Sequence, residues 1–126
     1  MKPERINLLL GLVWLILGMG LGEHMGRVGD HSQHVTHAHI MLVGGVLPIL
    51  FALIYRAFAL VQGLLAWIQT LLHHVGAAVM IVSLYMLYGA IAPESTLGPV
   101  LGISAMLIIL SVVLVLVQAL RGKQAA

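Results

Sequence analysis

Residues 36–55 read THAHIMLVGGVLPILFALIY, and these twenty positions contain no Asp, Glu, Lys or Arg. A bilayer core of about 30 Å needs about 20 apolar residues per helix, so this stretch predicts a membrane span. Three further stretches qualify: roughly Ile6 to Met25, Trp67 to Ile91 and Leu97 to Leu120. The sequence therefore predicts an all-α fold, a bundle of four transmembrane helices forming one integral membrane domain over residues 1–126.

The composition supports a membrane protein over a soluble one. Of the 126 residues, 61% are hydrophobic and only 8% are charged, whereas soluble domains carry about 25% charged residues. The absence of cysteine excludes disulfides and thiolate metal sites. Six basic residues against four acidic ones do not indicate nucleic-acid binding. The lipid bilayer is the expected partner.

The N-terminus has features of a signal peptide, because Lys2 and Arg5 precede an apolar run. No Ala-x-Ala-like cleavage site follows that run, so we expect a retained first helix. Small residues follow instead at positions that suit close helix packing, and others occur in the second and third spans. They are Gly18, Gly20, Gly22 and Gly26, then Gly44 and Gly45, which interrupt the second span, and Gly76.

The distribution of basic residues predicts the orientation. With four crossings, five of the six basic residues fall on one side: Lys2, Arg5, Arg56, Arg121 and Lys123. The positive-inside rule then places both termini and the loop at Arg56 in the cytoplasm of a bacterial cell. The apolar segment from Arg56 to Ala66 either extends a helix or lies along the interface.

The loop from Glu23 to Val35 then lies on the periplasmic side of the inner membrane. It is polar and contains three of the seven histidines. Asp30 or Ser32 could cap an early start of the second helix. The last span, nearly all Leu, Ile and Val with two serines, is expected to face lipid. The Trp and Tyr residues are expected to anchor helices at the interface, namely Trp14, Trp67, Tyr55, Tyr85 and Tyr88.

His37 and His39 are the central observation, because ionisable residues within membrane spans are rare and usually functional. Two helical residues in an i, i+2 relation lie about 200° apart around the axis. They cannot both bind one small ion from a regular helix, so they face two different sites. Neutral imidazole suits haem iron, which tolerates an apolar surround.

The run from His37 to Pro48, HAHIMLVGGVLP, resembles the haem-ligating helix II of haem-copper oxidase subunit I. That helix carries a histidine, Ala, Ile-Met and then proline at the same distance. The His-x-His pair also resembles helix X of that subunit, where two histidines serve two different haems. Similarity to short bacterial membrane proteins related to that subunit extends over roughly residues 18–80. It lies in Leu21-Gly-x-x-Met25-Gly, Asp30-His31 and His37-Ala-His39-x-x-Leu42-x-Gly44.

This resemblance implies that His37 is a low-spin haem ligand and that His39 is a second ligand. The chain has four of the twelve helices and no copper-site histidine pair with a tyrosine, so oxygen reduction, and enzyme activity generally, are not expected. The oxidase subunit has three arcs of four helices, and a homotrimer of this chain would reproduce them. In such a trimer, His37 of one copy and His39 of another would bind one haem.

Four further residues are weaker candidates. His73 forms either a second site or an interfacial contact with backbone or headgroups, and the adjacent His74 is expected to be structural. His24 could act as a ligand or bond a haem propionate. Arg27 could pair with a propionate too, although a solvated loop pair with Glu23 or Asp30 is the favoured interpretation.

The spacing His31-x-x-His34-x-x-His37 also suits copper or zinc, because i, i+3 residues lie on adjoining helix faces. Polar loops often contain histidines without a metal, and that interpretation is favoured. Three hypotheses follow. The leading one is a haem b protein for electron transfer or, with one labile ligand, for sensing a diatomic gas. The alternatives are a copper or zinc binder or transporter, and a cofactor-free structural or assembly subunit.

Overall fold

The structure is a computed structural model that describes residues 1–122. Lys123, one of the basic residues used to predict the orientation, lies outside the described residues. Four helices are long and apolar enough to cross a membrane, and residues 1–122 contain no strand. The predicted all-α fold is therefore confirmed. The elements are α1 (Pro3–Val28), α2 (His34–His39), η1 (Ile40–Val46), α3 (Leu47–Ala57), α4 (Leu64–Tyr88) and α5 (Glu94–Arg121).

The second span is one rod of 24 residues, from His34 to Ala57, with a π-helical segment in its middle. Gly44 and Gly45 lie in that segment, so they change the hydrogen-bond pattern of the helix without ending it. Leu47 marks the change, because its N–H donates to the carbonyl of Leu42, five residues earlier. An α-helix would use the carbonyl four residues earlier.

Local signals account for the ends of the helices. Pro3 stands in the first turn of α1, where a missing N–H costs nothing. Gly29 ends α1 in the left-handed conformation (φ 72°), and its N–H donates to the carbonyl of Met25. The expected cap on the second span is wrong: Asp30 instead accepts a bond from the N–H of Ser32, and α2 begins at His34 without a side-chain cap.

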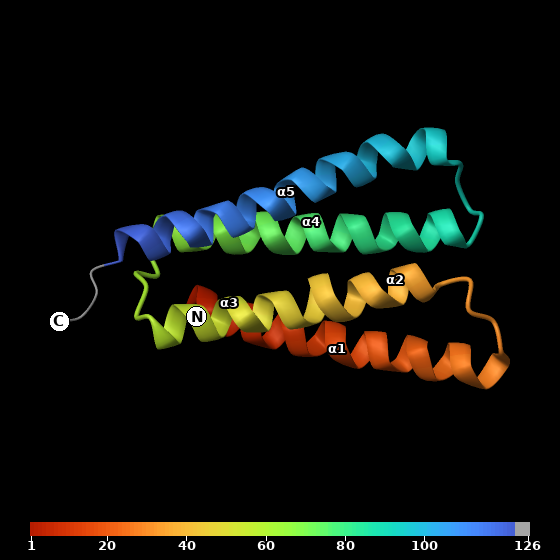
Figure 1. The fold of residues 1–126 in the computed structure, drawn as a ribbon, viewed down its shortest axis with the longest axis horizontal. Coiled ribbons are helices and arrows are strands. Elements are labelled where there is room, and N and C mark those ends of the chain that lie inside the picture. The colour runs from red at the N-terminus through yellow and green to blue at the C-terminus, as the bar shows by residue number, and fades with distance from the viewer. Residues whose placement is uncertain (123–126) are drawn as a thin grey trace.

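The four spans run antiparallel in two pairs, α1 beside the second span and α4 beside α5 (Figure 1). The N-terminus, the connection between α3 and α4 and the end of α5 lie together at one end of the bundle (Figure 1), here called the terminal end. The loops that follow α1 and α4 lie at the other end, here called the loop end. The histidine-rich loop is one of these two.

The segment after Arg56 does not continue the helix, and it does not lie along the surface over its whole length. Helix α3 ends at Ala57 and α4 begins at Leu64. Between them, Leu60 is 6% exposed and its N–H donates to the carbonyl of Tyr55. Leu60 belongs to a hydrophobic cluster with Phe51, Tyr55, Ala66 and Val115. The connection therefore closes the core at the terminal end.

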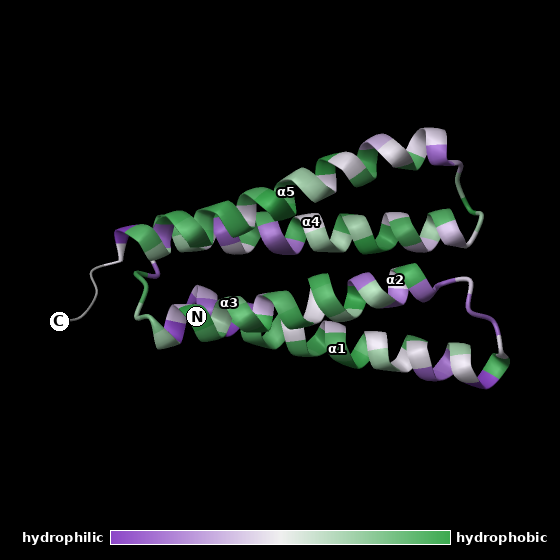
Figure 2. Cartoon of the chain, in the orientation of Figure 1, coloured by the Kyte–Doolittle hydropathy of each residue, from purple (hydrophilic) through white to green (hydrophobic). Residues whose placement is uncertain are grey.

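The outward faces of all four spans are apolar, as a bilayer requires (Figure 2). On α1, Ile16 is 69% exposed, and on α5 Ile103 is 65% exposed. The prediction that the last span faces lipid is correct for only part of its surface. Ser104 and Ser111 are fully buried, and their hydroxyls donate to carbonyls of their own helix.

Glycines allow the close approach of α1 and the second span. A methyl group on Gly18 would lie 2.5 Å from Sδ of Met41 and 2.8 Å from a side-chain carbon of Ile40, so a larger residue there would force these neighbours to shift. Gly22 is equally confined. The expectation that Gly20 and Gly26 pack against a helix is wrong, because within residues 1–122 no atom of a neighbouring helix lies within 4 Å of a methyl group built on either.

Two aromatic residues predicted as interfacial anchors pack against other helices instead: Tyr55 is buried and Trp14 is half-buried. Trp14 lies in the middle of α1, where its ring fills the space left by Gly44. Tyr55 is 1% exposed, and its hydroxyl is enclosed by hydrogen bonds. Both rings contact residues far away in the sequence. The residues that flank Trp14 and Tyr55 in the sequence give no sign of these partners.

Candidate haem-ligand site

His37 lies in the contact between α2 and α1. Its Nδ1 is 2.9 Å from the carbonyl oxygen of Gly18. Its ring lies over Gly22, where a methyl group would be 2.7 Å from Cε1 of the imidazole. Two glycines one turn apart on α1 therefore provide both the space for this ring and its hydrogen-bond acceptor.

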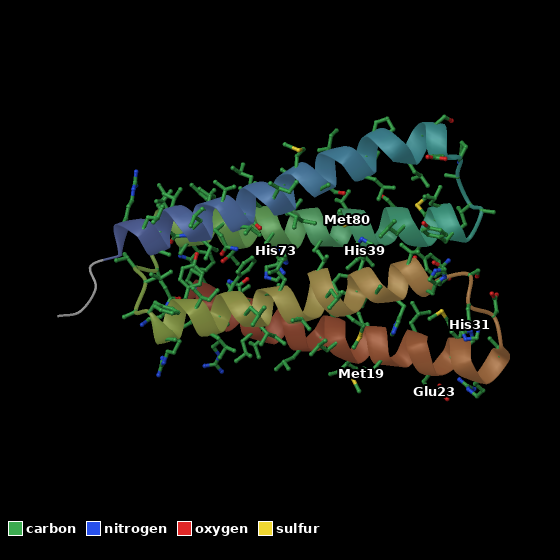
Figure 3. All side chains as sticks on the ribbon, in the orientation of Figure 1. Met19, Glu23, His31, His39, His73 and Met80 are labelled. Atoms are coloured by element: carbon green, nitrogen blue, oxygen red, sulfur yellow. The ribbon has the colours of Figure 1, made fainter. Side chains whose placement is uncertain are left out.

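His39 has a different environment. Its Nδ1 is 2.8 Å from the carbonyl oxygen of Val35, one turn earlier on its own helix. Figure 3 shows His39 on the side of α2 that faces α4, whereas His37 contacts α1. The two rings therefore point to different sides of the helix, as an i, i+2 relation requires.

The hydrogen bonds define the chemistry that these two rings offer. A carbonyl oxygen only accepts, so the Nδ1 of each ring carries the proton and donates it. In a neutral imidazole the lone pair then lies on Nε2. Within residues 1–122, neither Nε2 has a hydrogen-bond partner. Metal-ligating histidines in proteins are held in this way, through the nitrogen that does not bind the metal.

The loop histidines do not gather around one point. The Nδ1 of His34 lies 2.9 Å from the carbonyl oxygen of His31, so these two residues make a local backbone contact. Over the part of the chain that the structure describes, no three His, Asp or Glu side chains form a group that could hold a metal ion. The spacing His31, His34, His37 therefore does not produce a three-ligand site in this conformation.

His24 and Arg27 lie near the end of α1, exposed to solvent. Arg27 donates to both carboxylate oxygens of Glu23, each at 3.2 Å, which is the loop pair favoured from the sequence. Hydrogen bonds from the backbone and side chain of Ser32 hold the pKa of Asp30 below its ordinary value, and nearby His31 and His24 contribute in the same direction. This end of the molecule is a solvated polar surface.

His73 lies in the interior and not at the membrane interface. Its side chain is fully buried and packs edge-on against Phe51, with ring centroids 5.1 Å apart. Its Nε2 donates to the carbonyl oxygen of Val43 at 2.9 Å. Val43 lies six positions after His37, about 9 Å of helix rise, so His73 lies deeper along the span than the pair at 37 and 39. Its Nε2, unlike theirs, is committed to a carbonyl.

The π-helix explains why Val43 needs this partner. In an α-helix the carbonyl of Val43 would accept from the N–H of Leu47, but that N–H bonds Leu42. The π-type alternative is the N–H of residue 48, which is proline and has none. The carbonyl is thus left without a backbone donor inside the membrane, where an unsatisfied polar group is costly. His73, thirty residues away, supplies the missing proton.

A second polar feature, which the sequence did not predict, joins all four spans near the terminal end. His74 lies 2.9 Å from Oδ1 of Asn7, and Nδ2 of Asn7 donates to Thr70. Nearby, the hydroxyl of Tyr55 donates to Gln69 and accepts from Gln118. We call these six residues the buried polar network. Isolated Asn, Gln and Thr positions within long apolar runs were its only sign in the sequence.

Comparison of this chain with models of protein families, with curated proteins and with solved structures finds no match. A functional proposal for this chain therefore rests on its fold and on the geometry of its histidines.

Proposed function

We propose that this protein is an integral membrane haem b protein, related to one four-helix repeat of haem-copper oxidase subunit I, in which His37 and His39 are axial ligands. One observation carries the proposal: the Nδ1 of each ring donates to a backbone carbonyl, so each Nε2 keeps a lone pair for iron. The resemblance of residues 37–48 to a haem-ligating helix adds support.

The donor set fits the group. Neutral imidazole is the usual axial ligand of haem iron, and the carbonyl partner of each Nδ1 holds the ring orientation and raises the basicity of Nε2. Iron with two histidine ligands supplies one-electron chemistry and has no open position for a substrate. The residues of this chain would fix the two rings and exclude water. We therefore propose electron transfer as the activity.

The divergence of the two rings favours an oligomer. His37 and His39 of one copy face different sides of α2, so each haem takes its second ligand from a neighbouring copy. Such a head-to-tail contact repeats until a ring closes. We propose a homotrimer, which reproduces the three four-helix arcs of the oxidase subunit. We expect a mass measurement in mild detergent to give three chains per particle, and a monomer with full haem would contradict this.

We also propose that both termini are cytoplasmic and that the protein resides in a bacterial inner membrane. Arg5, Arg56 and Arg121 lie at the terminal end of the bundle (Figure 1), and the positive-inside rule assigns such an end to the cytoplasm. The loop with His31 and His34 would then face the periplasm.

The test is an absorption spectrum of the purified protein with pyridine extraction to identify the haem. We expect a sharp Soret band that is lost in His37→Ala and in His39→Ala, because each variant removes one axial ligand. His31→Ala is the matched control and is expected to keep the band. Unchanged haem in both of the first two variants would contradict the assignment.

The same samples separate the alternative functions. A colourless protein that contains copper or zinc, with the metal lost in His31→Ala, would identify a metal binder. A protein with neither colour nor metal, in which His37→Ala changes only stability, would identify a structural subunit.

A further inference from the structure

A groove between α1 and α3 opens at the terminal end, with a volume of about 440 Å³. Such a volume lies within the range of small-molecule sites. Its walls are apolar: Leu8 and Leu9 come from α1, and Ala52 and Leu53 come from α3. Its rim is charged, with Glu4, Arg5 and Arg56.

The groove has charged groups at one end and apolar side chains deeper in the membrane, the same order as the headgroup and acyl chains of a phospholipid. On α1, Leu8 and Leu9 follow Arg5 by three and four residues, and on α3, Ala52 precedes Arg56 by four. Residues at these spacings share one helix face. Each helix therefore places a guanidinium at the end of the groove and apolar side chains one turn deeper in the membrane.

The charges at the rim do not cancel. Glu4 accepts from Gln62 at 2.8 Å and from Arg56 at 3.3 Å, and its side chain is only 17% exposed. The side chain of Arg56 remains 81% exposed despite this bond. Arg5 is exposed and forms no ion pair within residues 1–122. One carboxylate against two guanidinium groups leaves the rim with a net positive charge.

We propose that this groove binds one anionic phospholipid. The phosphate lies between Arg5 and Arg56, and an acyl chain lies along Leu8, Leu9 and Leu53. The ligand is a lipid because the site combines an anion-binding rim with an apolar trough, and the bilayer supplies such molecules at this depth. Basic pockets between transmembrane helices bind acidic headgroups through the same combination. The inference does not depend on haem binding.

The experiment is native mass spectrometry of the full chain in a neutral detergent, with phosphatidylglycerol or phosphatidylcholine of identical acyl chains. Phosphatidylglycerol is expected to bind more tightly. Arg5→Gln is expected to lower its affinity about fivefold, since one basic residue near a lipid headgroup contributes that much, and to lower that of phosphatidylcholine less, because the choline cation already offsets part of the attraction between its phosphate and Arg5. Arg27→Gln, at the loop end, is the control and should change neither affinity. Equal affinities for the two lipids, or equal losses in both variants, would overturn the proposal.

A second pair of variants tests the trough without changing charge. Leu9→Trp fills the groove and is expected to weaken the binding of both lipids, whereas Ile16→Trp, further along the exposed face of α1, is expected to have no effect. Millimolar inorganic phosphate should not displace phosphatidylglycerol. Displacement by phosphate alone, or equal binding by both Trp variants, would show that no acyl chain occupies the groove.

Discussion

His73→Leu is expected to lower the free energy of unfolding by about 1–3 kcal/mol, the cost of leaving one buried polar group unsatisfied. The group is the carbonyl of Val43, for which His73 is the donor. Most of this loss should disappear in a Pro48→Ala background, because alanine supplies an N–H at residue 48, five residues after Val43. A double-mutant cycle measured by reversible unfolding in mixed micelles should give a coupling of about 1 kcal/mol or more.

The neighbouring histidine provides the control for this cycle. His74→Leu also removes a partly buried hydrogen bond, but its partner is Asn7 on α1. Its cost should therefore be the same with proline or alanine at residue 48. If His73→Leu and Pro48→Ala were additive within about 0.5 kcal/mol, the assigned link between the π-helix and His73 would be wrong.

Gly22→Ala is expected to lower haem content at least about tenfold, the scale of losses caused by disturbing groups that orient a metal ligand. The added methyl group would lie 2.7 Å from the ring of His37, so the ring must leave its place. Its bond to the carbonyl of Gly18 would be lost with it. The measurement is the ratio of Soret to protein absorbance after purification. This prediction rests on the proposed function.

Gly26→Ala is the matched control, one turn further along α1, where no neighbouring helix of the described part of the chain lies within 4 Å of the added methyl group. It should retain full haem and at least equal stability, because alanine favours a helix more than glycine does. The unfolding midpoints of haem-free samples of the two variants are compared, to show whether a loss of haem results from a loss of fold stability. If Gly22→Ala kept its haem, the ring of His37 would not be the ligand in the position described.

The four spans and the divergence of His37 and His39 could be predicted because each depends on residues near in sequence. Hydropathy over about 20 residues decides whether a segment crosses a bilayer, and helical geometry decides that i and i+2 point apart. The packing role of Gly18 and Gly22 could also be predicted, because their four-residue spacing in the sequence is typical of closely packed membrane helices. That Gly26 contacts no neighbouring helix was not predicted, because α1 and α2 separate toward the loop end (Figure 1).

The tertiary partners could not be predicted. Tyr55 and Trp14 are residue types typical of interfacial anchors, and only their contacts with Gln118 and Gly44 show that they pack against other helices. The π-helix had a signal in Gly44, Gly45 and Pro48, but its identification needs the carbonyl acceptor of each backbone N–H. The acceptors of His37 and His39 were equally invisible, although they determine which nitrogen is free.

Because of the buried polar network, the terminal end of the bundle has more hydrogen bonds between helices than the loop end. Asn7, Tyr55, Gln69, Thr70, His74 and Gln118 link both helix pairs near the terminal end, and toward the loop end Gln33 donates to the carbonyl of Tyr85. Local opening should therefore begin at the loop end, where the fewest polar contacts must break. If the protein binds haem as proposed, the haem would enter beside His37 and His39 at this end, after the opposite half has already assembled.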